Sequence, residues 1–290
     1  MKIFHILPGL IIWLFSCSSP DTKKKSSEVS PRHDTLIAND SNPIAIDTTG
    51  KKEIISSSNQ ASGDDLPYPG WQPRIFQSDK VTVPSYGLDT VKALIAKVRP
   101  QADTSGGDDG MEALDERTYA SLSLEQKFTY VMIHPESYSQ MCDALPERKD
   151  EEHRIYGELP DIFGEFEWSE RQLNFFKNNR QAVEALMKDL IEKNNAVKGN
   201  FKEAIVEMNA KELIPYLIEY YNKEKKDHYI LTVLMRLMKD NKYPEFMNSA
   251  SYKKLYKDED SYSSYLVYNQ ANEDLIIKRA MNFYNGLSSK

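Results

Sequence analysis

The C-terminal three quarters of the chain carry apolar residues at helical spacing. The clearest run has five apolar residues spaced three and four positions apart: Val183, Leu186, Met187, Leu190 and Ile191. This spacing places the side chains on one face of an α-helix, whereas a half-buried strand would alternate apolar and polar positions. A similar stripe formed by Leu88, Val91, Ile95 and Val98 ends at Pro100. The pattern therefore predicts a succession of amphipathic helices.

Polar residues mark where several of these helices begin. Ser123 with Gln126, and Ser169 with Gln172, have the spacing of a capping box, in which two side chains bond to free N–H groups of the first turn. Three other residues precede apolar stripes, and we expect each to open a helix: Asn209, Asp227 and Asn272. No segment shows strand alternation bounded by hairpin turns. The fold class predicted from the sequence is all-α.

Two architectures fit an all-α domain of this kind. The segment 186–192 (LMKDLIE) is echoed by the segment 213–219 (LIPYLIE), as it would be in a HEAT-type array of helical hairpins. Amphipathic helices resemble one another easily, however, and a solenoid needs at least three units of steady period. We therefore predict an irregular helical bundle, with a short HEAT-like helical-hairpin solenoid as the alternative.

The N-terminus has the features of a cleaved leader. Lys2 is followed by a mostly apolar run that extends to Phe15. This run is too short to span a bilayer, which takes about 20 residues, and is typical of a signal peptide. Leu14, Phe15 and Ser16 directly precede Cys17.

The Leu-Phe-Ser-Cys sequence resembles the lipobox of bacterial lipoprotein precursors, although Phe15 stands where that motif usually has a small residue. The resemblance implies that residues 1–16 are removed and that Cys17 carries the acyl chains of a membrane anchor, commonly palmitate. Ser18, in place of the aspartate that signals inner-membrane retention, implies the outer membrane. The chain has two cysteines, so lipidation would leave Cys142 without an intramolecular partner.

The segment after the lipobox is polar. Residues 18–80 are rich in serine, threonine, aspartate, lysine and proline, and their apolar residues occur only in small groups. Such a composition buries too little surface to offset the entropy of ordering, so we predict a disordered linker over residues 17–80. The helical globular domain then comprises residues 81–290.

Charge narrows the range of partners. The formal net charge is −7, and the acidic excess lies in the predicted domain, which has no basic stripe. Nucleic-acid binding depends on clustered lysine and arginine, so we expect no nucleic-acid partner. We expect the protein to reach the membrane through its lipid anchor and to bind an envelope protein or polymer. The chain lacks the GxGxxG, GxxxxGK[ST] and GxSxG motifs, and we expect no cofactor.

Two histidines and several carboxylates are candidates for chemistry. His134 lies in the sequence Ile-His-Pro-Glu, and His153 follows three acidic residues. Together with Glu158 and Asp161 they supply the ligand types that zinc prefers. No HExxH sequence or pair of histidines one helical turn apart holds them together, so we expect no metal site.

The segment 156–168 (YGELPDIFGEFEW) mixes glycines, carboxylates and aromatic residues without helical period. Glu165 and Glu167 would suit glycan hydrolysis, which uses two carboxylates, here beside aromatic rings. The simpler interpretation, which we favour, is a structural loop whose aromatic residues enter the core while its acids face water.

The sequence therefore favours a lipid-anchored binding or scaffold domain of the cell envelope over an enzyme. The alternative is an envelope hydrolase that uses acidic residues of the segment 156–168, with or without the histidines. Its candidate residues are Glu158, Asp161, Glu165, Glu167, His134 and His153.

Overall fold

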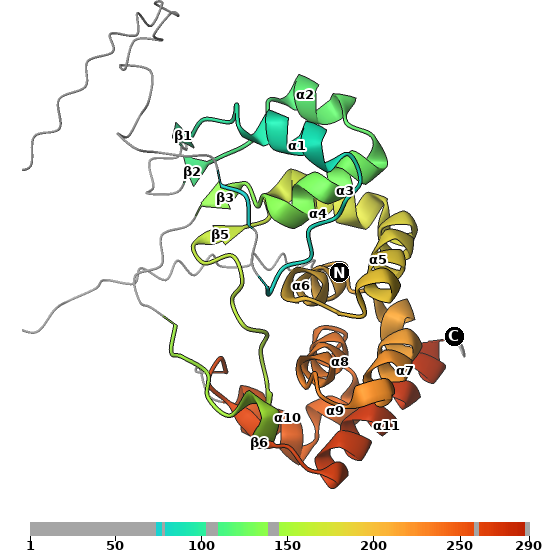
Figure 1. Ribbon diagram of the computed structural model, residues 1–290. Helices are drawn as coiled ribbons and strands as arrows, with labels where there is room; N and C mark the ends of the chain where they lie inside the picture. Colours follow the sequence, from blue (N-terminus) through green and yellow to red (C-terminus); the bar gives the residue numbers. More distant parts are fainter. Residues whose placement is uncertain (1–73, 77–78, 103–109, 139–144, 258–260, 288–290) are drawn as a thin grey trace, which may run out of the picture. The chain divides into compact units, whose positions relative to one another are not determined.

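A computed structural model describes five stretches of the chain: residues 74–76, 79–102, 110–138, 145–257 and 261–287 (Figure 1). The predicted signal peptide, the lipidation site Cys17, most of the predicted linker and Cys142 lie outside these residues. The described residues all belong to one compact unit that spans residues 59–290.

Helices make up most of the described residues. Before residue 195 they are α1 (Leu88–Ile95), α2 (Glu116–Ser121), α3 (Leu124–Ile133), α4 (Glu170–Asn178) and α5 (Arg180–Asn194). After residue 195 they are α6 (Gly199–Glu207), α7 (Ile214–Glu224), α8 (Tyr229–Asp240), α9 (Pro244–Met247), α10 (Ala250–Tyr256) and α11 (Gln270–Leu287). Short 3₁₀ turns at Glu151–His153 and Lys211–Leu213 complete the helical content of the described residues.

Two small antiparallel sheets accompany the helices. The prediction of an all-α domain missed these sheets. The first has the strand order β1-β2-β3-β5 and is formed by β1 (Gln101–Ala102), β2 (Gly110–Met111), β3 (Ser137–Tyr138) and β5 (Phe166–Glu167). The second pairs β4 (Arg154–Tyr156) with β6 (Tyr265–Val267), so that Ile155 lies opposite Leu266. Strands of two or three residues are too short to display alternation, so the pattern of apolar and polar residues does not reveal them.

The two predicted capping boxes are present. The Ser123 hydroxyl accepts from the N–H of Gln126 at the start of α3, and the Gln126 side chain bonds back to the Ser123 N–H. Ser169 and Gln172 form the same pair at the start of α4. These bonds satisfy N–H groups that have no partner inside the helix.

The other three predicted helices are present, but the residues expected to open them do not cap them. Asn209 has a φ of 51° and exchanges side-chain hydrogen bonds with Asn241, and α7 begins only at Ile214. The Asp227 carboxylate pairs with Lys202 instead of capping α8. The helix expected after Asn272 begins earlier, at Gln270. In the first two cases a tertiary contact takes the side chain that could have capped the helix.

One or two residues after each of the helices α5 to α8, the chain has a left-handed residue that is not glycine. These residues are Asn195, Asn209, Lys225 and Lys242, with φ between 45° and 54°. This conformation reverses the chain at a helix end but brings Cβ close to the backbone.

The core is centred on α8, eight of whose twelve residues are buried. Helix α8 contacts α6, α7, α9 and α11 (Figure 1). Ile75 and Phe76, from the segment predicted as linker, also pack against the core, and the Phe76 N–H donates to the Ile133 carbonyl at 2.8 Å. None of the described helices is long and apolar enough to cross a membrane.

A buried ionic network joins α3 and α4 through Glu136, the residue that precedes β3. The Glu136 side chain is fully buried and accepts from the Arg171 guanidinium, from the Tyr130 hydroxyl at 2.7 Å and from the Ser169 hydroxyl at 2.5 Å. Arg171 also donates to the Leu114 carbonyl at 2.6 Å. We call these five residues the Glu136 network. Every oxygen of the buried carboxylate has a donor, which a charge removed from water requires.

Candidate functional site

Helix α6 forms one wall of each of two neighbouring cavities. Phe201, Ala204 and Ile205 are fully buried on the core side of α6, and the helix packs against α8. Lys202, Glu203 and Glu207 lie among the residues that line the cavities. Helix α6 thus packs its apolar residues into the core and places charged residues of both signs at the cavities.

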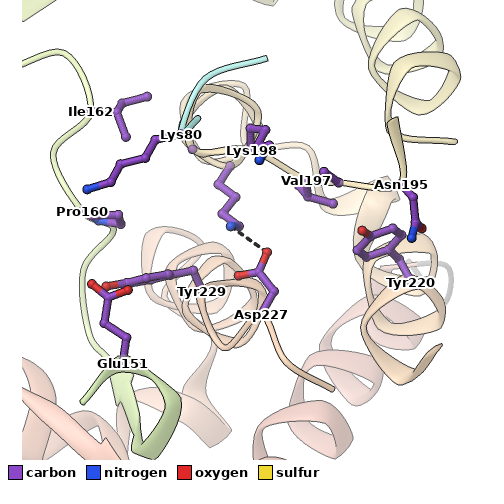
Figure 2. A pocket seen from close by; sticks show the side chains of 13 residues that line it. Lys80, Glu151, Pro160, Ile162, Asn195, Val197, Lys198, Tyr220, Asp227 and Tyr229 are labelled. Carbon is purple, nitrogen blue, oxygen red and sulfur yellow. Dashed lines mark ion pairs between the residues drawn. The ribbon is translucent and has the colours of Figure 1, made fainter. Parts of the chain in front are cut away.

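The first cavity, which we call the lysine pocket, lies at the N-terminus of α6 and has a volume of about 360 Å³ (Figure 2). Its lining comes from several separate segments and comprises Lys80, Glu151, Pro160, Ile162, Asn195, Ala196, Val197, Lys198, Gly199, Lys202, Tyr220, Asp227 and Tyr229. The Lys202 ammonium lies 2.7 Å from the Asp227 carboxylate, and the Lys202 side chain is 9% exposed. This ion pair fixes Lys202 in the middle of the cavity.

Backbone contacts hold Lys80 beside α6. The Gly199 N–H donates to the Lys80 carbonyl at 2.8 Å. The side chain of Asn200 accepts from the N–H of Thr82 at 2.9 Å and donates to its carbonyl at 2.8 Å. In Figure 2 the Lys80 side chain extends toward Ile162 and Pro160, away from the Lys202–Asp227 pair. The lysines of this pocket are thus spread along it.

Gly199 allows the segment 160–163 to lie directly against α6. A Cβ atom at this position would be 2.6 Å from Cγ2 of Ile162 and 3.2 Å from the Lys80 carbonyl oxygen. Both distances are shorter than ordinary van der Waals contact. The absence of a side chain at Gly199 therefore sets the position of Ile162, which lines both cavities.

The second cavity, which we call the acidic pocket, has a volume of about 220 Å³. Its lining combines four carboxylates with aromatic and aliphatic side chains: Asp161, Ile162, Phe163, Phe166, Glu167, Trp168, Leu173, Glu203 and Glu207. Glu203 and Glu207 are four residues apart on α6, a spacing that makes side chains neighbours on one helix face. The indole N–H of Trp168 donates to the Val131 carbonyl at 2.8 Å, which fixes that ring.

The acidic pocket disfavours negative charge on its own carboxylates. Burial raises the pKa of Glu203 to about 7; Arg236 opposes this shift, and Glu207, Glu158 and Asp161 add to it. Burial also raises the pKa of Glu207, again against Arg236. At neutral pH this pocket therefore contains a carboxyl group poised between its charged and neutral forms, next to other carboxylates.

Ile162 lines both the lysine pocket and the acidic pocket, and together we call these two cavities the α6 groove. Both cavities are open to solvent. The acidic pocket contains carboxylates without a lysine or arginine in its lining, whereas the lysine pocket combines three lysines with the carboxylates of Glu151 and Asp227.

Two of the six residues predicted as catalytic candidates line the α6 groove. Asp161 and Glu167 are exposed residues of the acidic pocket. The Asp161 carboxylate accepts from the N–H groups of Phe163 and Gly164, at 3.1 Å and 2.9 Å, and so holds the turn that brings Phe163 inward. Phe163 and Phe166 are buried, in agreement with the structural interpretation of this loop.

The other two acidic candidates lie elsewhere. Glu158 pairs with Arg236 and with Lys239, whose ammonium is 2.9 Å away, and its side chain is only 16% exposed. It is therefore held in an ion-pair network on α8 and does not face water as the loop interpretation expected. Glu165 is half-buried and lines neither cavity of the α6 groove.

The structure brings neither histidine to these carboxylates. His134 is fully buried at the end of α3, with Nδ1 2.7 Å from the Arg74 carbonyl and Nε2 2.5 Å from the Glu112 carbonyl. His153 is 74% exposed beside Glu152. Neither ring lines the α6 groove. Among the described residues, no group of three or more histidines, cysteines or acids could hold a metal ion.

Sequence reasoning missed Glu203, Glu207 and the lysines of the groove. The pair of glutamates four residues apart, with buried Ile205 between them, was visible in the sequence, but such a pair usually marks a solvated helix face. Comparison with known protein families, with curated proteins and with solved structures found no match.

Proposed function

We propose that this protein is a lipid-anchored component of the bacterial cell envelope, held in the outer membrane, whose helical domain binds an envelope protein or polymer in the α6 groove. The observation that carries the binding function is the groove itself, an open concave surface with charges of both signs. Binding sites are commonly concave surfaces with a few placed polar groups. The Leu-Phe-Ser-Cys17 sequence supports the anchor.

For the architecture we propose an irregular helical bundle. In a solenoid each repeat contacts only its neighbours in sequence. Helix α11, by contrast, packs on α7 and α8, although α9 and α10 separate it from them along the chain. This contact supports a bundle closed around α8.

Fractionation of cells that produce the Cys17→Ser variant tests the anchor. We expect the wild-type protein in the outer-membrane fraction and the variant in the soluble fraction, because two or more acyl chains hold a protein stably at a membrane. A Cys17→Ser protein that is still processed and stays with the membrane would contradict the proposal.

Photo-crosslinking in intact cells tests the binding function. A photoreactive residue at position 198, in the lysine pocket, is compared with one at position 278, an exposed position on α11 outside the α6 groove. We expect a discrete adduct from position 198 alone. The same adduct from both positions, or no reproducible adduct from position 198, would count against the groove as the binding site.

The acidic pocket also supports a second function, hydrolysis of an envelope polysaccharide. Such enzymes pair a protonated carboxyl group with an ionised one beside the bound sugar. Glu203, with its pKa raised to about 7, would serve as the acid, and Asp161 or Glu167 as its partner. Release of reducing ends from envelope polysaccharide by the wild-type protein, lost in Glu203→Gln, is the expected result. A wild-type protein without this activity would exclude the function.

A further inference from the structure

We propose that the acidic pocket of the α6 groove binds a basic side chain, lysine or arginine, that a protein partner inserts into it. The charged end of this side chain lies among the carboxylates, and its hydrocarbon part lies against the aromatic rings. This inference rests on the proposed function, because it takes the α6 groove as the binding site and names the side chain that one of its two cavities receives.

Glu203 lacks the basic partner that other shielded glutamates of this fold have. In the described part of the chain, four glutamates with side chains at most 16% exposed each form an ion pair with a lysine or arginine: Glu136, Glu158, Glu184 and Glu273. Glu203 is half-buried, and its carboxylate has no hydrogen bond or ion pair to the described residues. Arg236 attracts it from farther away but pairs with Glu158. The Glu203 carboxylate therefore lines the cavity without a partner.

The lining of the acidic pocket has negative charge without positive charge to match it. Its four carboxylates come from α6 and from the segment 161–167, and the lining includes no lysine or arginine. Burial raises the pKa of Glu207, and Arg236 and Lys177, which lie outside the lining, oppose that shift without cancelling it. A cation that enters the pocket supplies the charge that its ionised carboxylates lack.

The aromatic part of the lining suits the same ligand. Phe163 and Trp168 meet edge to face with ring centroids 5.4 Å apart, and the hydrogen bond from Trp168 to the Val131 carbonyl fixes the indole. The guanidinium of Arg74 lies 4.3 Å from the centroid of the Phe166 ring. Aromatic faces attract cations, more strongly where water is partly excluded. One ring of this lining thus already stabilises a basic side chain of the same chain.

The size of the acidic pocket favours one side chain over a larger ligand. Its volume of about 220 Å³ is below the roughly 300–1,000 Å³ of cavities that enclose a whole small-molecule ligand. A lysine or arginine side chain combines a hydrocarbon stem with a single charged end. These two parts match the rings and the carboxylates, whereas a hydrated metal ion would leave the apolar lining without a contact. Because the cavity is open to solvent, a side chain on a partner's surface can enter it.

Fluorine NMR of the full-length protein in detergent, with 5-fluorotryptophan, tests the ligand class. Trp168 lines the acidic pocket, and its signal is identified by its loss in Trp168→Phe. The probes are the acetylated amides of arginine, lysine and citrulline, added at pH 8. We expect the arginine or the lysine amide to shift the Trp168 signal saturably. Citrulline has nearly the shape of arginine without its charge, so its amide should bind at least about tenfold more weakly than the arginine amide.

Two matched variants locate the binding in the acidic pocket. The double variant Glu203→Gln, Glu207→Gln should weaken binding of the basic amide at least about tenfold. Glu219→Gln is the control, because Glu219 is an exposed glutamate of α7 that lines neither cavity. That variant should bind as the wild type does. No saturable shift with either basic amide, an equal response to citrulline, or equal affinity in the double variant would overturn the inference.

Photo-crosslinking in cells distinguishes a partner's side chain from a free amine. Position 177 is exposed on α4, near Glu207. We expect a photoreactive residue there to form a protein adduct that Glu207→Lys reduces at least about tenfold and Glu219→Lys leaves unchanged. If the basic amide binds but no adduct depends on Glu207, the pocket takes a free amine and the inference is wrong.

The crosslink from position 198 separates this inference from the proposed function. If no basic amide binds but position 198 still forms its adduct, the inference fails and the α6 groove binds another class of group. Absence of both the amide binding and the adduct from position 198 would overturn the inference and the proposed function together.

Discussion

The Glu136 network and the acidic pocket place carboxyl groups beside the same core in opposite ways. Glu136 is fully buried, and an arginine, a serine hydroxyl and a tyrosine hydroxyl surround it. Glu203 is only partly buried, and its pKa is raised because burial and neighbouring carboxylates outweigh the attraction of Arg236. Groups of the same chain compensate the charge of the Glu136 carboxylate, whereas Arg236 compensates that of Glu203 only in part.

This difference separates a structural charge from one that is open to a ligand. A buried carboxylate with a full set of donors ties elements together, and removing a partner leaves an uncompensated charge. A carboxyl group that its surroundings hold partly neutral destabilises the fold when it ionises, and an incoming cation relieves that cost. We therefore expect substitutions in the two regions to change stability in opposite directions.

The largest effect should follow from Glu136→Gln. The substitution leaves the Arg171 guanidinium without its buried counter-charge, so we expect the free energy of unfolding to fall by roughly 3–5 kcal/mol. Urea unfolding at neutral pH measures the change. Glu116→Gln is the matched control, because Glu116 pairs with the same arginine but is 82% exposed. That variant should change stability by less than about 1 kcal/mol. Equal losses in both variants would show that the burial of Glu136 does not determine how much its ion pair with Arg171 stabilises the fold.

Glu203→Gln should have the opposite sign. The pKa of Glu203 is raised from 4.5 to about 7, so the folded protein binds this proton more tightly than the unfolded chain. Stability therefore falls as the pH rises through this window and stays lower above it. At pH 8 the variant should be more stable than the wild type by up to about 3 kcal/mol, and near pH 4 the two should be similar.

Denaturation between pH 4 and pH 8 measures the effect of Glu203→Gln. Glu207→Gln serves as the control, since Glu207 lies on the same helix face and is more exposed. We expect its gain at pH 8 to be smaller. If Glu203→Gln destabilises the protein at pH 8, Glu203 is a matched structural charge like Glu136.

The smallest effect distinguishes the two capping boxes. Ser123→Ala removes an exposed cap of α3 and should cost about 1 kcal/mol. Ser169→Ala removes the cap of α4 and also the hydroxyl that donates to Glu136, so we expect a loss of about 2 kcal/mol. Thermal unfolding of the two variants side by side gives the comparison. If the two variants lose the same stability, the bond from Ser169 to Glu136 adds nothing measurable to the cap of α4.

The sequence predicted those features of the fold that local pattern controls. The stripes of α1 and α5 and both capping boxes depend on residues within one or two turns of each other, and all are present. Asn209 and Asp227 do not cap the helices expected to open at them, because Asn241 and Lys202, far along the chain, bind their side chains. Likewise the strand pairs β2–β3 and β3–β5 join distant segments.

The candidate site was predicted only in part for the same reason. Asp161 and Glu167 stood out because acids alternate with aromatic residues in their segment, and the acidic pocket contains both. Glu203 and Glu207 belong to a separate helix, and only the packing of α6 against the segment 160–168 brings the two sets together. A single sequence gives no measure of that packing.

The left-handed residues after α5, α6, α7 and α8 bear on which substitutions the chain can tolerate. Asparagine already adopts this conformation with little strain, whereas a β-branched residue at Asn195 or Asn209 would strain the backbone at a helix end. At position 242 lysine adopts the left-handed conformation less readily than asparagine does, and glycine there would relieve the backbone strain. In a survey of random variants these positions should accept glycine and reject valine, even though Asn195 is an exposed residue.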